Sequence, residues 1–341
     1  MASPKPVLGL GRSLMSVQEL AKEPMLTIPE HYICADQEPS TLSHGTSLPV
    51  IPILDMEQLL MGEATDLELD KLHSICKEWG IFQLVNHGVS SLLVEKMKSE
   101  VEEFYKLPVE EKMKYKIKQG DVEGYGQTIL VQEAQKVDWA DRETLESYIS
   151  ELQKLAMTLF GFMAKALKIG KSEMEEMFGD GMQSMRMTYY PPCPQPQKVM
   201  GLTAHSDATV ITILLQLNGV EGLQVKRDGN WIPVSILPNA FVVNVGDILE
   251  IFSNGLYKSI EHRATVNSVK ERISIAMFFK PKLESEIGPS STLINPKNPP
   301  LFKRVGVEKY FKDFFSRKLN GKSYLEQMRI GNENGEDHNT L

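Results

Sequence analysis

Residues 205–245 read HSDATVITILLQLNGVEGLQVKRDGNWIPVSILPNAFVVNV, and this stretch indicates the fold. Short apolar runs alternate with turns that contain Gly, Pro or Asn, which is typical of an antiparallel β structure. The same pattern continues on both sides. The strand-like runs are Ser184–Tyr190, Val210–Leu217, Gly222–Lys226, Trp231–Val234, Ala240–Val245, Ile248–Phe252, Lys258–Val266 and Arg272–Phe279. So many short strands in one block predict two sheets wrapped into a jelly roll.

The residues before this block have a helical pattern. Apolar residues recur at helical spacing from Leu69 to Trp79, from Val94 to Tyr105 and from Leu145 to Met163. A short helix is expected near Val17–Ala21 and another after Val307. The fold class is therefore predicted to be mainly β with flanking helices (α+β): a double-stranded β-helix, or jelly-roll, core with a helical N-terminal region.

Composition limits the class of protein. Of the 341 residues, 42% are hydrophobic and 24% charged, as in an ordinary soluble globular protein. The net charge of −8 and the lack of a basic block argue against nucleic acid as a partner. No apolar run reaches the length of a membrane span or resembles an export signal. The three cysteines are unpatterned, so we expect reduced thiols in a cytoplasmic protein.

Three residues in and beside the strand block form a candidate metal site. His205 and Asp207 share a predicted turn at a strand edge, and His262 lies on a distant strand. Two imidazoles and one carboxylate suit a divalent iron and leave coordination positions open. Separately, a His-x-Asp pair is more often a polar turn, and His262 could be a hydrogen-bonded strand histidine. The ordered combination within predicted strands favours the metal site.

A candidate carboxylate receptor follows the second histidine. Arg272 and Ser274 lie on the same face of a predicted strand, because side chains alternate along a strand. An arginine at this place could be a surface ion-pair partner, but beside a metal its fork suits a carboxylate. The residues together indicate an iron enzyme with an organic acid as co-substrate. Met185 and Met187 are candidates for the border of its cavity.

Longer motifs give a resemblance to a known family. They are MTYYPPCP over 187–194, CKEWGIFQLVNHG over 76–88, DWAD over 138–141, Asn254-Gly255, and the short segments around His205, His262 and Arg272. With these the chain strongly resembles the plant 2-oxoglutarate/iron(II)-dependent dioxygenases, in particular the alkaloid O-demethylase and senescence-related group. The similarity extends over nearly the whole chain.

The resemblance implies an organisation into four segments. These are an N-terminal non-haem dioxygenase region over residues 1–141, connecting helices over 142–182, the iron(II)/2-oxoglutarate dioxygenase domain over 183–282, and a C-terminal helix and tail over 283–341. It implies a helical N-terminal region on a double-stranded β-helix, in agreement with the pattern of the residues.

The resemblance also implies roles for single residues. His205, Asp207 and His262 correspond to the iron ligands. Arg272 and Ser274 correspond to the groups that hold the distal carboxylate of 2-oxoglutarate, and Tyr190 to a further hydrogen-bond donor to it. Thr188 occupies a position that also touches the co-substrate and where the family usually has Asn. A second departure follows Asp141, where the family has an outer strand and a proline-rich loop that this chain lacks.

The expected activity is that of an oxygenase that uses Fe(II), 2-oxoglutarate and O2, with ascorbate as a supporting reductant. The substrate implied is a small plant specialised metabolite, with O-demethylation of an alkaloid or hydroxylation of an aromatic compound as the reaction, and we expect a monomer. One alternative is a catalytically impaired or silent binding or regulatory homologue, because the segment after Asp141 is missing. Another is a related iron oxidase without 2-oxoglutarate, against which Arg272 and Ser274 argue.

Overall fold

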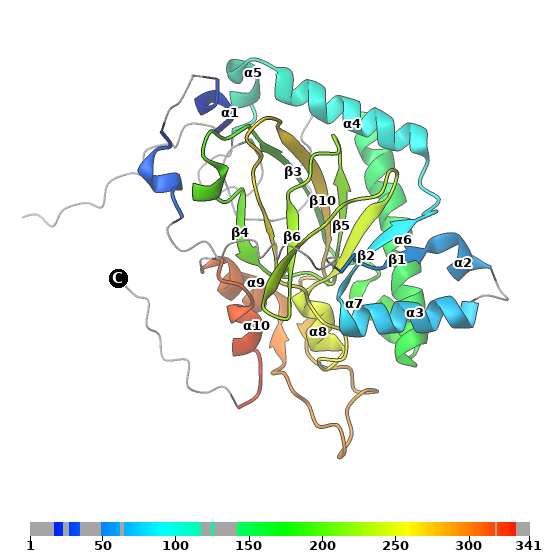
Figure 1. Ribbon diagram of the computed structural model, residues 1–341. Coiled ribbons are helices and arrows are strands. Elements are labelled where there is room, and N and C mark those ends of the chain that lie inside the picture. The colour runs from blue at the N-terminus through cyan, green and yellow to red at the C-terminus, as the bar shows by residue number, and fades with distance from the viewer. Residues whose placement is uncertain are drawn as a thin grey trace, which may run out of the picture.

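Two β-sheets form the centre of the molecule (Figure 1). The computed structural model of the chain describes residues 17–22, 27–34, 49–61, 65–116, 124–125, 142–317 and 319–331. The six-stranded sheet has the order β1 (Ile53–Asp55), β2 (Ile81–Val85), β8 (Phe241–Val245), β5 (Ile211–Gln216), β10 (Arg272–Phe279), β3 (Gln183–Tyr190). The four-stranded sheet has the order β4 (Leu202–His205), β9 (His262–Ala264), β6 (Leu223–Arg227), β7 (Asn230–Pro233). A small pair joins β11 (Glu286–Ile287) and β12 (Val305–Gly306).

The pairing of the strands is antiparallel except between β1 and β2. In the six-stranded sheet Ser274 of β10 pairs with Thr188 of β3 on one side and with Gln216 of β5 on the other. In the four-stranded sheet His205 pairs with His262. The mainly β jelly-roll core with flanking helices is therefore confirmed.

Helices cover one face of the six-stranded sheet and the ends of the barrel (Figure 1). The long helix α6 contacts α3, α4 and α7, and its inward residues Tyr148, Leu152 and Leu159 are fully buried. Burial of each such side chain contributes about 1.5–3 kcal/mol. The helices are α1 (Val17–Leu20), η1 (Glu30–Tyr32), α2 (Met56–Leu60), α3 (Thr65–Glu78), α4 (Ser91–Lys106), α5 (Val109–Met113), α6 (Arg142–Leu167), α7 (Lys171–Phe178), η2 (Pro196–Lys198), α8 (Asp247–Phe252), α9 (Val307–Phe315) and α10 (Ser323–Gln327).

One predicted strand is wrong. The run Ile248–Phe252 belongs to helix α8, which begins after Gly246. All six residues of α8 are buried, so no polar face marks the helical period. A short, wholly buried apolar run fits a strand and a helix equally well.

Other elements differ from their predicted bounds or were not predicted. The predicted strand Lys258–Val266 shortens to β9, since only three of its residues pair with β4 and β6. Sequence patterns did not predict β4, β11, β12 or α10, which are short and have little periodicity. The helix predicted near Val17–Ala21 is confirmed as α1.

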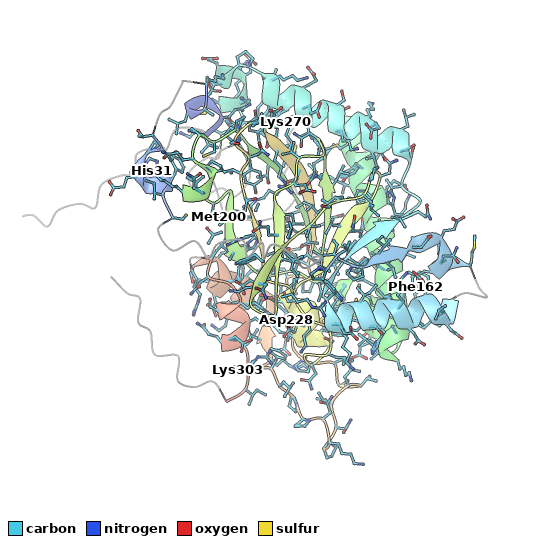
Figure 2. All side chains as sticks on the ribbon, in the orientation of Figure 1. His31, Phe162, Met200, Asp228, Lys270 and Lys303 are labelled. Carbon is cyan, nitrogen blue, oxygen red and sulfur yellow. The ribbon has the colours of Figure 1, made fainter. Side chains whose placement is uncertain are left out.

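The main hydrophobic core joins the six-stranded sheet to the helices: Ile213 and Ile275 of the strands and Leu152 and Leu159 of α6 belong to one buried cluster. Lys270, in the turn before β10, and Asp228, in the turn between β6 and β7, lie toward opposite ends of the barrel (Figure 2). Within the described ranges, no helix combines the length and the apolar character that a membrane crossing requires.

Candidate functional site

Two histidines meet where strands β4 and β9 pair. His205 is the last residue of β4, His262 is the first of β9, and their ring centroids lie 4.3 Å apart. Asp207 follows two residues after β4. Its Oδ1 lies 3.4 Å from Nε2 of His205 and 3.7 Å from Nε2 of His262. The three side chains offer ligand atoms within 4.8 Å of one another, which is the geometry of a small metal site.

Hydrogen bonds to the main chain fix the orientation of both imidazole rings. Nδ1 of His205 lies 2.7 Å from the carbonyl oxygen of Thr203, and Nδ1 of His262 lies 3.2 Å from that of Ile260. A carbonyl only accepts, so Nδ1 carries the hydrogen in each ring. The lone pair of each Nε2 is therefore left for a metal, as in metal sites where a carbonyl orients the ligand.

Asp207 is oriented by two residues that sequence analysis did not single out. Its Oδ2 accepts hydrogen bonds from Oγ1 of Thr212 at 2.6 Å and from Nδ2 of Asn244 at 2.9 Å. Both residues are buried on strands whose other members are mostly apolar. A polar residue inside a buried strand is the signal that could have identified them.

The electrostatics of the cluster agree with metal binding. Burial alone would raise the pKa of Asp207, but the two histidines and the hydroxyl of Thr212 outweigh it and hold the pKa well below its usual range. Burial lowers the pKa of His262, an effect that Asp207 opposes only in part. A carboxylate beside a neutral imidazole is the protonation state in which these groups bind a cation.

A buried guanidinium faces the same space. Arg272 at the start of β10 is only 2% exposed, and its Nε has no hydrogen-bond partner. Its Nη1 lies 3.4 Å from Oγ of Ser274, and the guanidinium lies 5.6 Å from the ring centroid of Tyr190. Burial lowers the pKa of Arg272, yet a guanidinium stays charged in proteins. A buried cation with an unused donor matches an anionic ligand that brings its own acceptors.

One cavity joins the cluster and the guanidinium. It is lined by every residue that the sequence predicted to bind the metal or the co-substrate: Thr188, Tyr190, His205, Asp207, His262, Arg272 and Ser274. Thr188 and Tyr190 lie two residues apart on β3, the strand next to Arg272. The structure thus brings all of them together.

The expectation for Met185 and Met187 was wrong. These side chains pack against the hydrophobic core on the opposite face of β3, and their neighbour Arg186 lines the cavity instead. The C-terminal region also contributes to the cavity, which the sequence patterns did not predict. Phe314 and Phe315 of α9, together with Leu319, line the cavity. Gly321 then exchanges main-chain hydrogen bonds with Ala204 and Ser206, on either side of His205.

Comparisons with known proteins identify the family. Residues 181–281 match the 2OG-Fe(II) oxygenase superfamily, and residues 51–159 match the N-terminal region of non-haem dioxygenases in morphine synthesis. Thebaine 6-O-demethylase from Papaver somniferum is 51% identical over 95% of this chain and 98% of its own length. The chain belongs to the 2-oxoglutarate–iron(II) oxygenase superfamily. The resemblance drawn from the sequence motifs is therefore confirmed, and so is the assignment as a 2-oxoglutarate-dependent dioxygenase.

Other members of the superfamily are similarly related. Codeine O-demethylase from Papaver somniferum is 49% identical and the oxoglutarate-dependent flavonoid 7-O-demethylase 1 from Ocimum basilicum is 48% identical, each over 95% of this chain and over 98% and 93% of their own lengths. The crystal structure of JOX2 in complex with 2OG, Fe and JA superimposes with a TM-score of 0.81 and 33% identity, over 94% of this chain and 98% of that one. The family's cofactors, Fe(II) and 2-oxoglutarate, fit the donors described above.

The place after Asp141 where the family has an extra strand and loop lies outside the described residues. The DWAD motif over 138–141 and the junction between Asp141 and Arg142 belong to the part of the chain that the structure does not describe, apart from the main chain at the start of α6. The alignment with codeine O-demethylase extends over 353 positions, although this chain has 341 residues. The relative therefore has positions that this chain lacks.

Proposed function

We propose that His205, Asp207 and His262 bind the Fe(II) and that Arg272 and Ser274 hold the distal carboxylate of 2-oxoglutarate. The observation that carries the proposal is the buried guanidinium of Arg272, whose Nε has no partner and which faces the same cavity as the three metal-binding groups. Removal of such a charge from water costs free energy unless a counter-charge is present. A dicarboxylate that also reaches the metal supplies that counter-charge.

Two further residues complete the proposed binding of the co-substrate. Tyr190 pairs with Arg272 across the strands, and Thr188 pairs with Ser274, so all four side chains lie at one end of the cavity. We propose the Tyr190 hydroxyl and the Thr188 hydroxyl as additional hydrogen-bond partners of 2-oxoglutarate. A threonine reaches less far than the asparagine usual in the family, so we expect its contact with the co-substrate to be weaker than that of the asparagine.

For the reaction, we propose O-demethylation of a small plant specialised metabolite, either an alkaloid or a flavonoid-like aromatic compound. The support is the high identity to demethylases of both kinds of compound. Hydroxylation of an aromatic compound is the alternative reaction. It uses the same chemistry, because O-demethylation and hydroxylation both begin with oxidation of a C–H bond.

The cofactors supply the oxidising chemistry, and the residues of the chain position the cofactors and the substrate. When bound, iron and 2-oxoglutarate activate O2 for oxidation of the substrate, with release of succinate and carbon dioxide. The chain holds the co-substrate through Arg272 and fixes the ligand rings through the carbonyls of Thr203 and Ile260. The apolar residues Phe314, Phe315 and Leu319 exclude water from the cavity and offer a surface to an aromatic substrate.

A second function, a catalytically impaired or silent binding homologue, has one observation in its favour. Strand β3 is an edge strand among the described residues, and its first seven residues are only half-buried. In the family an additional outer strand comes from the segment that this chain lacks after Asp141. Without it, the side of the cavity formed by β3 admits more water. No comparable observation favours an oxidase that works without 2-oxoglutarate, because such an enzyme binds no dicarboxylate that would require Arg272.

The test is a panel of methoxylated alkaloids and flavonoids, incubated with the purified chain, Fe(II), 2-oxoglutarate and ascorbate. Succinate and product are quantified together. We expect succinate to form with one of the substrates and to disappear in His262→Ala, which removes a metal ligand. Full activity of His262→Ala with iron still bound stoichiometrically contradicts the proposed ligand set. Iron and 2-oxoglutarate binding without any product supports the silent homologue.

Three smaller points are also proposals. We infer a cytoplasmic protein, which the free cysteines Cys34, Cys76 and Cys193 support, and we propose that it is a monomer. We expect ascorbate to sustain turnover by keeping the iron reduced. Size-exclusion chromatography with light scattering checks the monomer, and omission of ascorbate from the assay checks its role.

A further inference from the structure

A buried carboxylate of helix α8 joins two distant segments of the chain. Glu250 is only 1% exposed, and the proposed function gives it no role. Its Oε2 accepts hydrogen bonds from Nζ of Lys322 at 2.9 Å and from the main-chain N–H of Ser259 at 2.7 Å. Its Oε1 accepts one from Nη2 of Arg329 at 3.1 Å. The two cations flank α10, which lies at the same end of the barrel as α8 (Figure 1).

The first of these segments lies beside His205. Lys322, one of the two cations, directly follows Gly321. The main-chain N–H of Gly321 donates to the carbonyl of Ala204 at 3.0 Å, and its carbonyl accepts from the N–H of Ser206 at 3.2 Å. At His205, β4 pairs with β9 on one side, so these two bonds hold the main chain on the other. The ion pair of Lys322 keeps Gly321 in this place.

The second segment leads to His262. Ser259, whose N–H donates to Glu250, also accepts a 2.9 Å hydrogen bond at its carbonyl from Nζ of Lys322. The next residue, Ile260, is the one whose carbonyl orients the ring of His262. The pair of Glu250 and Lys322 therefore fixes both main-chain groups of Ser259, directly before the group that orients the second histidine.

Helix α8 is itself fixed relative to the third residue of the cluster. The main-chain N–H of Asp247, the first residue of α8, donates a 2.8 Å hydrogen bond to the carbonyl of Asp207. Oδ2 of Asp247 accepts a 3.0 Å hydrogen bond from Oγ of Ser206. All six residues of α8 are buried, so close packing holds the helix in place. A carboxylate on this helix can therefore fix the position of the residues that it binds.

We propose that Glu250 is a positioning residue of the metal site. It acts on one histidine through Lys322 and Gly321, and on the other through Ser259. The inference rests on the proposed binding of Fe(II) by two histidines and an aspartate, which it deepens. Groups that hold the ligands of a metal also determine its affinity. Because both histidines depend on one carboxylate, its loss disturbs two of the three ligands at once.

The test replaces Glu250 with Gln and measures metal binding rather than turnover. Glutamine has nearly the same shape but offers no charge to Lys322 and Arg329. Co(II) is the probe, because it is stable in air and its visible absorption depends on the coordination geometry. We expect Glu250→Gln to weaken Co(II) binding at least about tenfold and to change the spectrum. A variant that unfolds at lower temperature, with unchanged Co(II) affinity and spectrum, overturns the proposal, because Glu250 then only stabilises the fold.

Two variants of Lys322 test whether the ion pair is responsible. Lys322→Met should weaken Co(II) binding about tenfold, whereas Lys322→Arg retains the charge and should bind as the unchanged chain does. In the metal-free chain, Lys322→Met should also speed hydrogen exchange of the Ser206 N–H about tenfold, because Gly321 is released. Lys309→Met is the matched control, since Lys309 forms an exposed pair with Asp313 on α9. Equal Co(II) affinities, or equal exchange rates, in Lys322→Met and Lys309→Met contradict the proposal.

A change at Gly321 tests the contact without removing a charge, and it decides if Glu250→Gln does not fold. Gly321 has φ +51°, and a Cβ added there would lie 3.2 Å from Oε1 of Glu261, the residue before His262. Gly321→Ala should therefore shift this segment and weaken Co(II) binding about tenfold. Gly229, in the turn between β6 and β7, has φ +78° but open space around an added Cβ, so Gly229→Ala is the control. Equal Co(II) affinities of the two alanine variants overturn the proposal.

One further variant separates this inference from the proposed function. His262→Ala removes a proposed ligand itself. Loss of Co(II) binding in His262→Ala, together with full binding in Glu250→Gln, contradicts only the positioning role. Stoichiometric Co(II) binding in His262→Ala with an unchanged spectrum contradicts the proposed ligand set.

Discussion

Oδ2 of Asp207 accepts a 2.6 Å hydrogen bond from the hydroxyl of Thr212, and this bond leaves Oδ1 facing the two histidines. The pair joins the two sheets of the barrel, since Thr212 lies on β5 and Asp207 follows β4. The position of the Asp207 carboxylate, which we propose as a metal ligand, is therefore set by the core of the six-stranded sheet rather than by the turn that carries it.

Replacement of Thr212 with Val should weaken iron binding without unfolding the chain. Valine keeps the shape and loses the hydroxyl, so Asp207 retains only the bond from Asn244. Loss of a group that orients a metal ligand typically costs about 10–100-fold in affinity. Anaerobic titration with Fe(II) measures the change. Thr158→Val, at an exposed position on α6, is the control, and equal affinities of the two variants would show that Thr212 does not orient the ligand.

Replacement of Arg272 with Lys should raise the requirement for 2-oxoglutarate. A lysine supplies a point charge and cannot reproduce the two-pronged contact. A charged hydrogen bond contributes about 1.5–3 kcal/mol, so the expected loss is about tenfold to a hundredfold in the KM for 2-oxoglutarate. Succinate formation at varied co-substrate measures it. Arg304→Lys, at a guanidinium that bonds only the carbonyl of Pro289 among the described contacts, should behave as the unchanged chain. An unaltered requirement in Arg272→Lys would revive the oxidase that needs no 2-oxoglutarate.

The segment that the family has after Asp141 should improve coupling when it is inserted before Arg142. Strand β3 is half-buried along most of its length and, among the described residues, lies at the edge of its sheet. An edge strand offers main-chain groups with which a further strand can pair. A covered β3 narrows the access of water to the cavity. We expect the extended chain to form more product per succinate than the chain as it stands.

The measurement quantifies succinate and product in the same reaction for both chains. An insertion of equal length built from Gly and Ser is the control for added residues alone. If the unmodified chain already forms one product per succinate, at the same rate as the extended chain, the segment is dispensable.

The three cysteines should differ in reactivity as their burial predicts. Cys34 is exposed, while burial raises the pKa of Cys193 and raises that of Cys76 far more. The thiolate is the reactive form, so a raised pKa slows alkylation. Iodoacetamide followed by peptide mass spectrometry should label Cys34 first, Cys193 more slowly, and Cys76 only after unfolding. Labelling of Cys76 in the native protein at the rate of Cys34 would contradict the packing of α3.

Sequence patterns were sufficient for the fold where amphipathic or alternating residues marked one buried face. Strand β10 matches its predicted bounds, and helix α6 contains the predicted helical pattern from Leu145 to Met163, because each has a clear period. The pattern failed at α8, which is buried on all sides and therefore lacks a period to read. Strand β4 was missed because it has only four residues, too few to show a clear period.

The candidate site was predictable only in its directly binding groups. Residue type alone suggests metal or carboxylate binding for five residues: His205, Asp207, His262, Arg272 and Ser274. Thr212 and Asn244 act through Asp207, and nothing along the chain indicates which carboxylate they contact. Contacts of this kind depend on the register between β5, β8 and β10, which only the folded structure supplies.

The location of the iron tests the central claim most directly. Crystals of the full chain grown without oxygen, with Fe(II) and 2-oxoglutarate, give an anomalous difference map at the iron absorption edge. We predict a single strong peak bounded by Nε2 of His205, Oδ1 of Asp207 and Nε2 of His262, with 2-oxoglutarate between it and Arg272. A peak bound by other residues, or a co-substrate that does not contact Arg272, would contradict it.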